Sequence, residues 1–501
     1  MLNIISVAFL VLIAGDFLKR SESALHLLQL EGYDLKKYNN WLKNNSGKLM
    51  SLGKLIEPDK SPLVYTERAI RLKKTHFIVN IIMCFILFVI GYLLRNSFLY
   101  FLIVIIYVFM YMMEPYIMNI TANINAPKEK AINLGFYKTA QEKISSMNNL
   151  KVVGITGSYG KTSTKFITST ILKEKYKVQD TPSSYNTPMG LSRVINEELT
   201  DDKEIFVAEM GAYVKGEIKE VADLVQPDIG IITSIGPAHL ESFGSIDNII
   251  KTKYEIIEAL DKDGIAIFNY DDENLKTIAD ETKLKKYYYG FNDVEKLDVY
   301  AKDISVNSRG SEFVLVIKAT GEIKCKTKML GRHNIGNILA GCTVGHILGL
   351  TLEEIATGVS KIEPVEHRLN IIDPGTGVII IDDGFNSNPS GAKAALEVLN
   401  EFKTGRKFVV TPGMIELGEL EFEENKKFGK LMGEVADFVF LVGKKRTLPI
   451  FEGLKETNIS MDNVYPVDSL DEATQIFGKL LQSGDVILFE NDLPDNYNEE
   501  D

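Results

Sequence analysis

Cysteine, tryptophan and histidine are scarce in this 501-residue chain, which contains three, one and six of them. The cysteines, Cys84, Cys325 and Cys342, lack the paired spacing of metal or redox sites, which excludes a thiol-held metal and fits a reducing compartment. The net charge is −12 and no basic patch interleaved with aromatic residues follows residue 126. Nucleic acid is therefore excluded as a partner.

Long uncharged runs are confined to residues 1–126 and predict a membrane region there. Residues 1–15, 77–94 and 98–118 are the apolar stretches, expected as an anchor and a transmembrane hairpin. The loop 16–76 carries twelve lysines and arginines against seven acids. The positive-inside rule then predicts a multi-pass protein of the cell membrane, in contact with the lipid bilayer, with this loop and the catalytic domains in the cytoplasm. Tyr38 and Trp41 fit either a helix at the headgroup level or an ordinary solvated helix.

After residue 126, β-branched apolar runs alternate with helical patterns. This alternation predicts an α/β fold of parallel sheets covered by helices, with ligands at the carboxyl ends of the strands. Pro364 marks a break between a central phosphate-loop ATP-binding domain at 127–364 and a C-terminal, Rossmann-like doubly wound domain at 365–501. The expected strands are 205–208, 228–234, 264–269, 378–381, 408–411, 438–442 and 486–489.

Residues 154–164 read Gly-Ile-Thr-Gly-Ser-Tyr-Gly-Lys-Thr-Ser-Thr and follow an apolar strand. Gly157 and Gly160 would let backbone N–H groups converge on phosphate oxygens, Lys161 would add a positive charge, and the Thr162 hydroxyl could reach a bound Mg²⁺. The glycine spacing is not the common one, and a glycine turn without a ligand is the alternative. The predicted nucleotide contacts in this segment are Gly157, Ser158, Tyr159, Gly160, Lys161, Thr162 and Ser163.

Three ionisable residues follow in positions that suit a catalytic site. Glu209 ends an apolar strand, where a carboxylate is well placed to hold Mg²⁺. His239 lies in a glycine–proline loop after another strand, and Lys253 lies on a helix. The alternatives are a surface acid, a structural histidine and a solvated lysine.

A second group of polar residues lies further along the chain. Asn334 and Asn337 are three residues apart on one helix face and carry amides suited to a base or a ribose. Asp383 lies where a strand of the second domain ends, and Arg368 lies near the domain break. Arg368 could move onto phosphates when the domains close, or it could form an inter-domain salt bridge.

Together these residues resemble the Mur ligase family, and within it the branch that adds D-alanyl-D-alanine to a UDP-muramoyl tripeptide. The similarity covers about residues 127–501 and includes the offset glycine spacing. Its motifs, in order, are Thr156-Gly157-x-x-Gly160-Lys161-Thr162, Glu209, His239-Leu240-Glu241, Lys253-x-Glu255-Ile256, Asn269 in Asn-Tyr-Asp-Asp, His333-Asn334-x-x-Asn337, Arg368, and Asp382-Asp383-x-x-Asn386-x-Asn388-Pro389.

The resemblance implies an ADP-forming carboxylate–amine ligase that uses ATP and Mg²⁺ and activates its substrate as an acyl phosphate. Lys161, His239 and Lys253 are then the catalytic residues. Thr162 and Glu209 would bind one Mg²⁺, and His239 with a carbamylated Lys253 would serve a second, with Lys251 as a rival for the carbamate. The implied nucleotide contacts beyond the phosphate loop are Asn269, Asn334, Arg368 and Asp383.

Three departures from the family pattern bear on the substrates. The membrane-like region replaces the usual UDP-binding domain, Gly413 stands where an acid is common, and residues 488–492 lack an expected Lys-Gly-Ser run. The sequence predicts a membrane-anchored ligase of cell-wall peptidoglycan synthesis. Its partners would be a cell-wall precursor or a lipid-linked intermediate, and an amino acid or dipeptide amine. The alternatives are a poly-amino-acid synthase and a catalytically inactive membrane scaffold that senses nucleotide or muropeptide.

Overall fold

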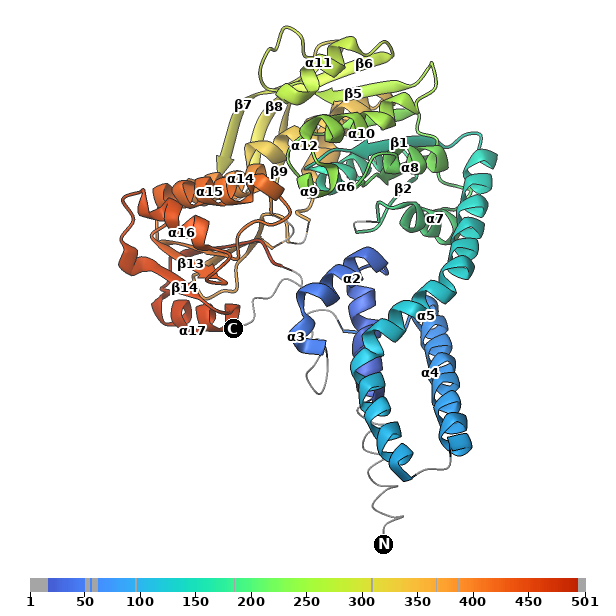
Figure 1. Ribbon diagram of the computed structural model, residues 1–501. Coiled ribbons are helices and arrows are strands. Elements are labelled where there is room, and N and C mark those ends of the chain that lie inside the picture. Colours follow the sequence, from blue (N-terminus) through green and yellow to red (C-terminus); the bar gives the residue numbers. More distant parts are fainter. Residues whose placement is uncertain are drawn as a thin grey trace. The chain divides into compact units, whose positions relative to one another are not determined.

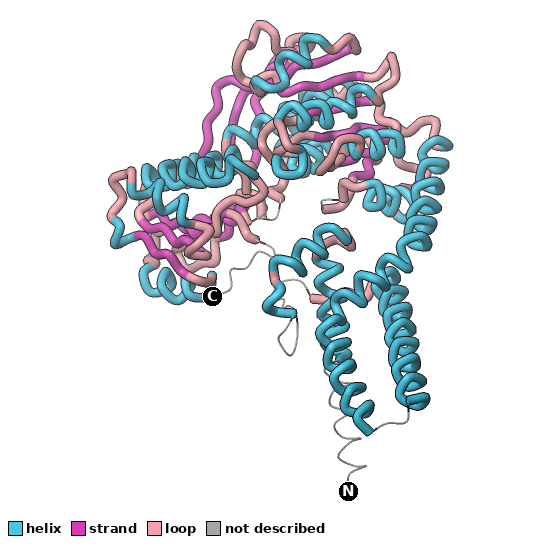
Figure 2. Tube along the Cα trace, viewed as in Figure 1, coloured by secondary structure: helices cyan, strands magenta, loops and turns pink. Residues whose placement is uncertain are grey.

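The computed structural model describes residues 17–49, 55, 62–94, 97–183, 185–307, 310–365, 367–384 and 387–493 (Figures 1 and 2). These residues separate into two compact units. The first lies within Met1–Gly135 and is built of helices, and the second lies within Phe136–Leu493 and holds two sheets.

The first unit packs its helices around a small apolar core. Residues 17–30 are helical, followed by α2 (Leu35–Asn44), α3 (Ser46–Leu49), α4 (Glu67–Leu94) and α5 (Ser97–Ser146). Tyr38 and Leu42 of α2 are buried in this core. The Tyr38 hydroxyl donates a hydrogen bond of 2.9 Å to the carbonyl of Pro115. The apolar face of α2 is therefore used within the unit itself.

Polar side chains are buried where α4 and α5 face each other. His76 pairs with Glu114, whose carboxylate also accepts a hydrogen bond of 3.3 Å from the Asn80 amide. Near the start of α4, Arg71 forms a 2.7 Å ion pair with Glu129. These contacts pair ionisable and amide side chains of residues 71–80 of α4 with residues 114–129 of α5, where an unpaired buried charge would be costly.

The structure corrects the predicted membrane region. Among the residues that it describes, no helix has the combination of length and apolar character required to cross a bilayer. The predicted spans at 77–94 and 98–118, and with them the multi-pass membrane localisation, are wrong. The predicted anchor at 1–15 lies outside the described residues. The predicted span at 98–118 contains Glu114, which is buried and paired with His76 of α4, and a count of apolar residues does not record that pairing.

The larger sheet of the second unit has nine strands in the order β2-β3-β1-β4-β5-β6-β7-β8-β9. Neighbouring strands are parallel from β2 to β7, whereas β8 pairs antiparallel with β7 and β9. The strands are β1 (Lys151–Thr156), β2 (Val178–Asp180), β3 (Ile205–Glu209), β4 (Ile229–Ile232), β5 (Ile265–Asn269), β6 (Lys285–Gly290), β7 (Val299–Asn307), β8 (Gly310–Ile317) and β9 (Gly321–Thr327).

Helices cover both faces of this sheet (Figure 1). Strand β1 is buried on both sides, and its residues alternate between two cores: Val153 packs with α6 and α12, and Val152 packs with α7, α8 and α10. This two-sided burial explains the continuous apolar runs in the sequence. The helices are α6 (Lys161–Leu172), α7 (Pro188–Glu197), α8 (Glu217–Val225), α9 (Leu240–Phe243), α10 (Ile246–Glu258), α11 (Glu273–Glu281), α12 (Arg332–Ile347) and α13 (Leu352–Ser360).

The smaller sheet has six strands in the order β10-β11-β15-β12-β13-β14, parallel except for β10. The strands are β10 (Asn370–Ile372), β11 (Ile379–Asp383), β12 (Lys407–Thr411), β13 (Phe438–Val442), β14 (Val464–Val467) and β15 (Val486–Glu490). The helical segments are α14 (Pro389–Glu401), η1 (Gly418–Leu420), α15 (Glu421–Val435), α16 (Leu448–Lys455), η2 (Met461–Asn463) and α17 (Leu470–Leu480). The two sheets confirm the predicted α/β class.

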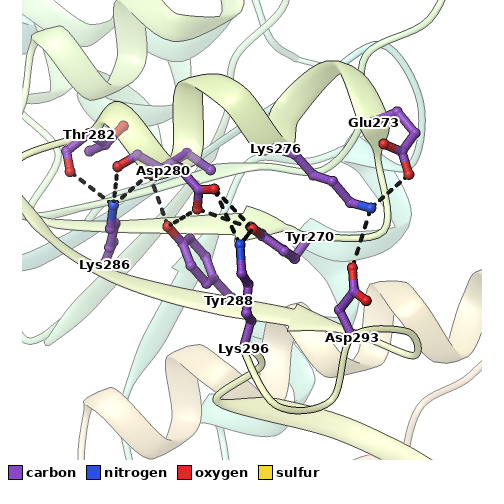
Figure 3. A network of polar contacts seen from close by, with 10 residues as sticks. Tyr270, Glu273, Lys276, Asp280, Thr282, Lys286, Tyr288, Asp293 and Lys296 are labelled. Carbon is purple, nitrogen blue, oxygen red and sulfur yellow. Dashed lines mark hydrogen bonds and ion pairs between the residues drawn. The ribbon is translucent and has the colours of Figure 1, made fainter.

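A polar network joins α11 to the strands beside it (Figure 3). Lys286 donates to the carbonyls of Ala279 and Asp280 at the carboxyl end of the helix, at 2.7 and 2.8 Å. The Asp280 carboxylate accepts from the hydroxyls of Tyr270 and Tyr288 at 3.1 Å. Because Tyr270 directly follows β5, the network fixes the chain next to Asn269, one of the expected nucleotide contacts.

Candidate active site

The phosphate loop joins β1 to α6 and depends on two glycines. Gly157 has φ 151°, and a Cβ there would lie 2.1 Å from Thr233 Oγ1. Gly160 has φ 79°, and a Cβ there would lie 2.7 Å from Asn337 Oδ1. No L side chain fits either position without displacing its neighbours. The sequence therefore places a tight backbone turn directly in front of the amino end of α6, as a phosphate cradle requires.

The loop is held against the segment that follows β4. Ser158 N donates to the Ser234 carbonyl at 2.8 Å, and its hydroxyl donates to the Gly236 carbonyl at 3.0 Å. Tyr159 N donates to Ser234 Oγ at 3.1 Å, and the Tyr159 ring packs on Gly236, where a Cβ would lie 2.4 Å from the ring. Burial raises the pKa of Tyr159, so this side chain stays a neutral phenol.

Lys161 folds back over this loop. Its Nζ donates to the carbonyls of Gly157 and Ser158 at 2.7 and 3.1 Å. Burial lowers the pKa of Lys161 to about 8, while Glu209 opposes the shift and Arg368 adds to it. Thr162 and Ser163, the next two residues of α6, are buried. An anionic ligand in the loop would restore the full charge of this lysine.

Glu209, at the carboxyl end of β3, is 1% exposed. Its Oε1 accepts a 3.0 Å hydrogen bond from the Asn186 amide, and Lys165 Nζ lies 3.5 Å from Oε2. Its backbone N–H donates to Thr181 Oγ1 at 3.3 Å. Oε2 itself accepts no hydrogen bond. A buried carboxylate oxygen without a donor is suited to a cation.

The residues fit the Mg²⁺ expected from the sequence. Within the described part of the chain, no group of three or more histidine, cysteine, aspartate or glutamate side chains could form a metal cage. Mg²⁺ commonly takes one or two protein oxygens and completes its shell with water and nucleotide phosphates. The Glu209 oxygen that accepts no hydrogen bond and the hydroxyl of Thr162 match that requirement. The assignment of both as Mg²⁺ ligands stays a prediction.

His239 precedes the short helix α9 and has φ 54°, an unusual value for a residue with a side chain. Its Nδ1 lies 2.6 Å from Glu416 Oε2, and its ring lies 4.4 Å from that of Tyr213. Glu416 follows β12 in the smaller-sheet part and also has a positive φ, of 64°. A carboxylate bonded to Nδ1 fixes the ring and leaves Nε2 as the second nitrogen for a ligand.

Lys253, on α10, is 3% exposed, whereas Lys251 on the same helix is exposed. Burial holds the pKa of Lys253 well below its usual range, and the charge of Lys161 lowers it further. A buried, neutral amine is the form that reacts with CO₂, so the surroundings favour Lys253 over Lys251 for a carbamate. Glu255 instead accepts from the N–H groups of Gly216 and Lys219, at 2.9 and 3.0 Å, and so holds the start of α8.

The predicted amide contacts lie in two places. Asn269 ends β5, where its amide donates to the Thr233 carbonyl at 3.0 Å and lies beside the phosphate loop. Asn334, at the start of α12, is buried and donates to the Leu330 carbonyl at 2.8 Å. Asn337 accepts from Thr164 of α6 at 3.2 Å. Asn337 thus links α12 to α6 next to Gly160, and Asn334 supports it through a hydrogen bond within α12.

Arg368 and Asp383 lie in the smaller-sheet part. Burial lowers the pKa of Arg368, and Asp383 and Glu209 oppose that shift. Burial raises the pKa of Asp383 to about 6, although its Oδ1 accepts from the Leu369 N–H at 3.1 Å. The charges of acids from both sheets therefore raise the pKa of Arg368 against the effect of burial.

The structure brings several predicted residues into electrostatic contact. The charges of Glu209 and Arg368 shift the pKa of Lys161, and the charge of Lys161 shifts that of Lys253. Asn186 and Lys165 contact Glu209, and Glu416 contacts His239, although the sequence alone did not point to these three residues. Lys165 could have been suspected from its position, four residues after Lys161 and thus on the same face of α6.

Comparison with known proteins agrees with this geometry. Residues 155–345 match the Mur ligase middle domain, and residues 367–490 match the Mur ligase, glutamate ligase domain. The chain is 33% identical over 342 residues to the UDP-N-acetylmuramoyl-tripeptide–D-alanyl-D-alanine ligase of Bacillus subtilis, which covers 68% of this chain and 72% of the relative. The Escherichia coli enzyme of the same name is 33% identical over 59% of this chain and 65% of its own length.

Solved structures show the same likeness. MurF from Acinetobacter baumannii superposes with a TM-score of 0.65 at 27% identity, covering 72% of this chain and 77% of its own. MurF ligase from Thermotoga maritima in complex with ADP gives a TM-score of 0.64 at 29% identity, covering 72% and 80%. The chain therefore belongs to the Mur ligase family, and is an ADP-forming acid–amino-acid ligase that uses ATP and Mg²⁺.

Proposed function

We propose that this chain adds D-alanyl-D-alanine to a UDP-N-acetylmuramoyl tripeptide, a step of peptidoglycan precursor synthesis. The observation that carries this proposal is the 33% identity to the ligase of that name from Bacillus subtilis, over 72% of the relative. The predicted site residues support it, because the phosphate loop precedes α6, Glu209 ends β3, His239 precedes α9, and Lys253 is buried on α10.

The proposed reaction proceeds in two transfers. The γ-phosphoryl group of ATP moves to the substrate carboxylate and gives an acyl phosphate; the amine then attacks the acyl carbon, forms the amide and releases phosphate. Mg²⁺, held by Thr162 and Glu209, would neutralise charge on the terminal phosphates. Lys161 and the N–H groups of the phosphate loop orient the transferred group, and Arg368 adds a positive charge from the other sheet.

The role of Lys253 in this scheme follows from its burial. A carbamate on Nζ would turn a cation into an oxygen ligand for a second Mg²⁺, which would also use the ring of His239. Glu416 would fix that ring through Nδ1. The low pKa that burial gives Lys253 supports the carbamate assignment.

One feature of the smaller sheet bears on the incoming amine. Glu490 ends β15, within the run where the family pattern predicts Lys-Gly-Ser, and it is fully buried. Its carboxyl accepts hydrogen bonds from the hydroxyls of Ser387 and, at 2.9 Å, Thr411. Because the buried acid Glu490 replaces this expected run, the test includes amines with and without a carboxylate.

The test uses the purified full chain with ATP, MgCl₂ and UDP-N-acetylmuramoyl tripeptide, and follows ADP release and product mass by liquid chromatography and mass spectrometry. The amines are D-alanyl-D-alanine, D-alanyl-D-lactate and D-alanyl-D-alanine amide. A product heavier by one dipeptide residue, absent with Lys161→Ala, supports the proposal. Ligation of a lipid-linked tripeptide but not the UDP-linked one would overturn the proposed acceptor, and preference for the amide over the free dipeptide would overturn the proposed amine.

A further inference from the structure

Lys165 is a buried lysine in α6 to which the reaction described above gives no role. It is 0% exposed, and it lies four residues after Lys161, on the same side of the helix. Its Nζ donates to the carbonyl of Ser183 and lies 4.1 Å from the centroid of the Phe166 ring. A lysine is almost never fully buried without an acid as its partner.

The acid beside Lys165 is Glu209, the predicted Mg²⁺ ligand. Lys165 Nζ lies 3.5 Å from Glu209 Oε2, the same oxygen that accepts no hydrogen bond. The other oxygen, Oε1, is satisfied by the Asn186 amide at 3.0 Å. The ammonium group therefore lies next to the one oxygen of Glu209 that is open to a metal ion.

The charge of Lys165 affects both the stability of the metal-free protein and its affinity for a metal ion. A buried carboxylate without a nearby cation is strongly destabilising, so Glu209 requires a counter-ion whenever no metal is bound. When a divalent cation binds the same oxygen, the lysine becomes a like charge a few ångströms away and opposes it. One group thus stabilises the metal-free protein and weakens metal binding.

We propose that Lys165 is a positioning residue that acts as the counter-ion of Glu209 in the metal-free protein and is displaced from Oε2 when Mg²⁺ binds with the nucleotide. The inference rests on the Mg²⁺ role of Glu209 within the proposed function, and it is independent of which carboxylate and amine are joined. The bond to Ser183 gives the ammonium group an anchor when Oε2 is taken. Ser183 has φ 45°, so this bond also secures a strained turn.

The test compares ADP binding with and without Mg²⁺. The ratio of the ADP dissociation constant in EDTA to that in saturating MgCl₂ measures how strongly the metal and the nucleotide favour each other. Isothermal titration calorimetry gives both constants without any amide-forming substrate, so failure of the proposed ligation leaves this experiment valid.

Lys165→Met removes the charge and nearly keeps the shape. We expect the ratio to rise by about tenfold or more, because Mg²⁺ no longer competes with an ammonium group. The melting temperature in EDTA without nucleotide falls and is recovered by Mg²⁺ with ADP, which supplies the missing positive charge. Lys165→Arg keeps the charge and keeps the wild-type ratio. Lys173→Met, an exposed lysine just after α6 that pairs with Asp180 at 3.3 Å, is the matched control and leaves the ratio unchanged.

An unchanged ratio in Lys165→Met overturns the proposal, since a purely structural lysine or a phosphate ligand would alter both dissociation constants equally. A ratio raised in Lys165→Arg or Lys173→Met as much as in Lys165→Met also overturns it, because charge at Oε2 would not be the cause. If Lys165→Met does not fold, the folding of the double variant Lys165→Met/Glu209→Gln tests the counter-ion role instead. The proposal requires this variant to fold, since no uncompensated acid remains, and its failure to fold overturns the counter-ion role.

Discussion

Lys253 illustrates how surroundings set the chemistry of a single residue. It has the same side chain as Lys251, two positions earlier on α10, but only Lys253 is buried. Burial and the charge of Lys161 hold its pKa well below the usual range. The two lysines therefore form a matched pair for a test.

Lys253→Ala is expected to lower amide formation by about 100-fold or more, because the second metal site loses its carbamate oxygens. The dissociation constant of ADP should stay within about threefold of the wild-type value, since the phosphate loop is intact. Lys251→Ala should leave both quantities unchanged. Product formation and calorimetry measure them, and ¹³C NMR in ¹³C-bicarbonate should show a carbamate signal that only Lys253→Ala removes. Full activity in Lys253→Ala would refute the assignment.

Gly157 offers a second test at the scale of one residue. Gly157→Ala brings a Cβ to 2.1 Å from Thr233 Oγ1 and places alanine at φ 151°. Relief of that contact must distort the loop, so ADP binding should weaken by about tenfold or more. Gly478→Ala in α17, where a Cβ meets nothing within 4 Å, is the control and should bind ADP normally. Normal binding by Gly157→Ala, measured by calorimetry, would count against this loop as the nucleotide site.

At the scale of elements, the loop between β12 and η1 forms a link between the two sheets that the sequence did not predict. Asn425 of α15 holds it, accepting from Met414 N at 2.9 Å and donating to the Met414 carbonyl at 2.9 Å. The loop carries Glu416 to His239, at 2.6 Å. Residues outside the loop, on α15, therefore help to set its geometry.

Glu416→Gln is expected to reduce kcat by about 10- to 100-fold, because His239 loses the carboxylate that orients its ring. The KM for ATP should change little, since neither residue belongs to the phosphate loop. Glu419→Gln, three residues later and exposed, provides the matched control with wild-type kinetics. A large rise in KM for ATP without a change in kcat would show that Glu416 acts on nucleotide binding instead.

At the scale of the whole molecule, the stability of the smaller-sheet part should depend on pH through Glu490. Burial raises the pKa of Glu490 to about 8 from its usual 4.5, and neighbouring Asp383 contributes to the rise. Asp383 and Glu490 are register partners on β11 and β15. The folded protein thus keeps a proton on Glu490 over a pH range in which the unfolded chain has lost it.

Because the folded state binds more protons between about pH 4.5 and about pH 8, the free energy of unfolding falls as pH rises through this window. Glu490→Gln keeps the shape and removes the ionisable group, so the decline should become shallower. Urea unfolding of both proteins at pH 5, 7 and 9 measures the difference. Parallel pH profiles for the two proteins would show that Glu490 does not carry this effect.

Short stretches of consecutive residues were sufficient to predict the local backbone structure and the functional groups that it carries. The turn 157–160 has a positive φ at Gly157 and Gly160, which favours glycine, an apolar run ending in Glu209 is a strand with an acid at its carboxyl end, and two-sided apolar runs form parallel sheets. These properties depend on backbone conformation and on residues adjacent in sequence. The ordered motifs also identified the family, which the comparisons confirm.

Only the tertiary structure decided which distant groups meet. Glu209 meets Asn186 and Lys165, and His239 meets Glu416 across 177 positions of sequence. The first 126 residues show the same limit, because hydropathy records side-chain type and not the pairing of His76 with Glu114. A contact between remote residues depends on how elements pack, and that packing is a sum over many residues that no single segment of the sequence contains.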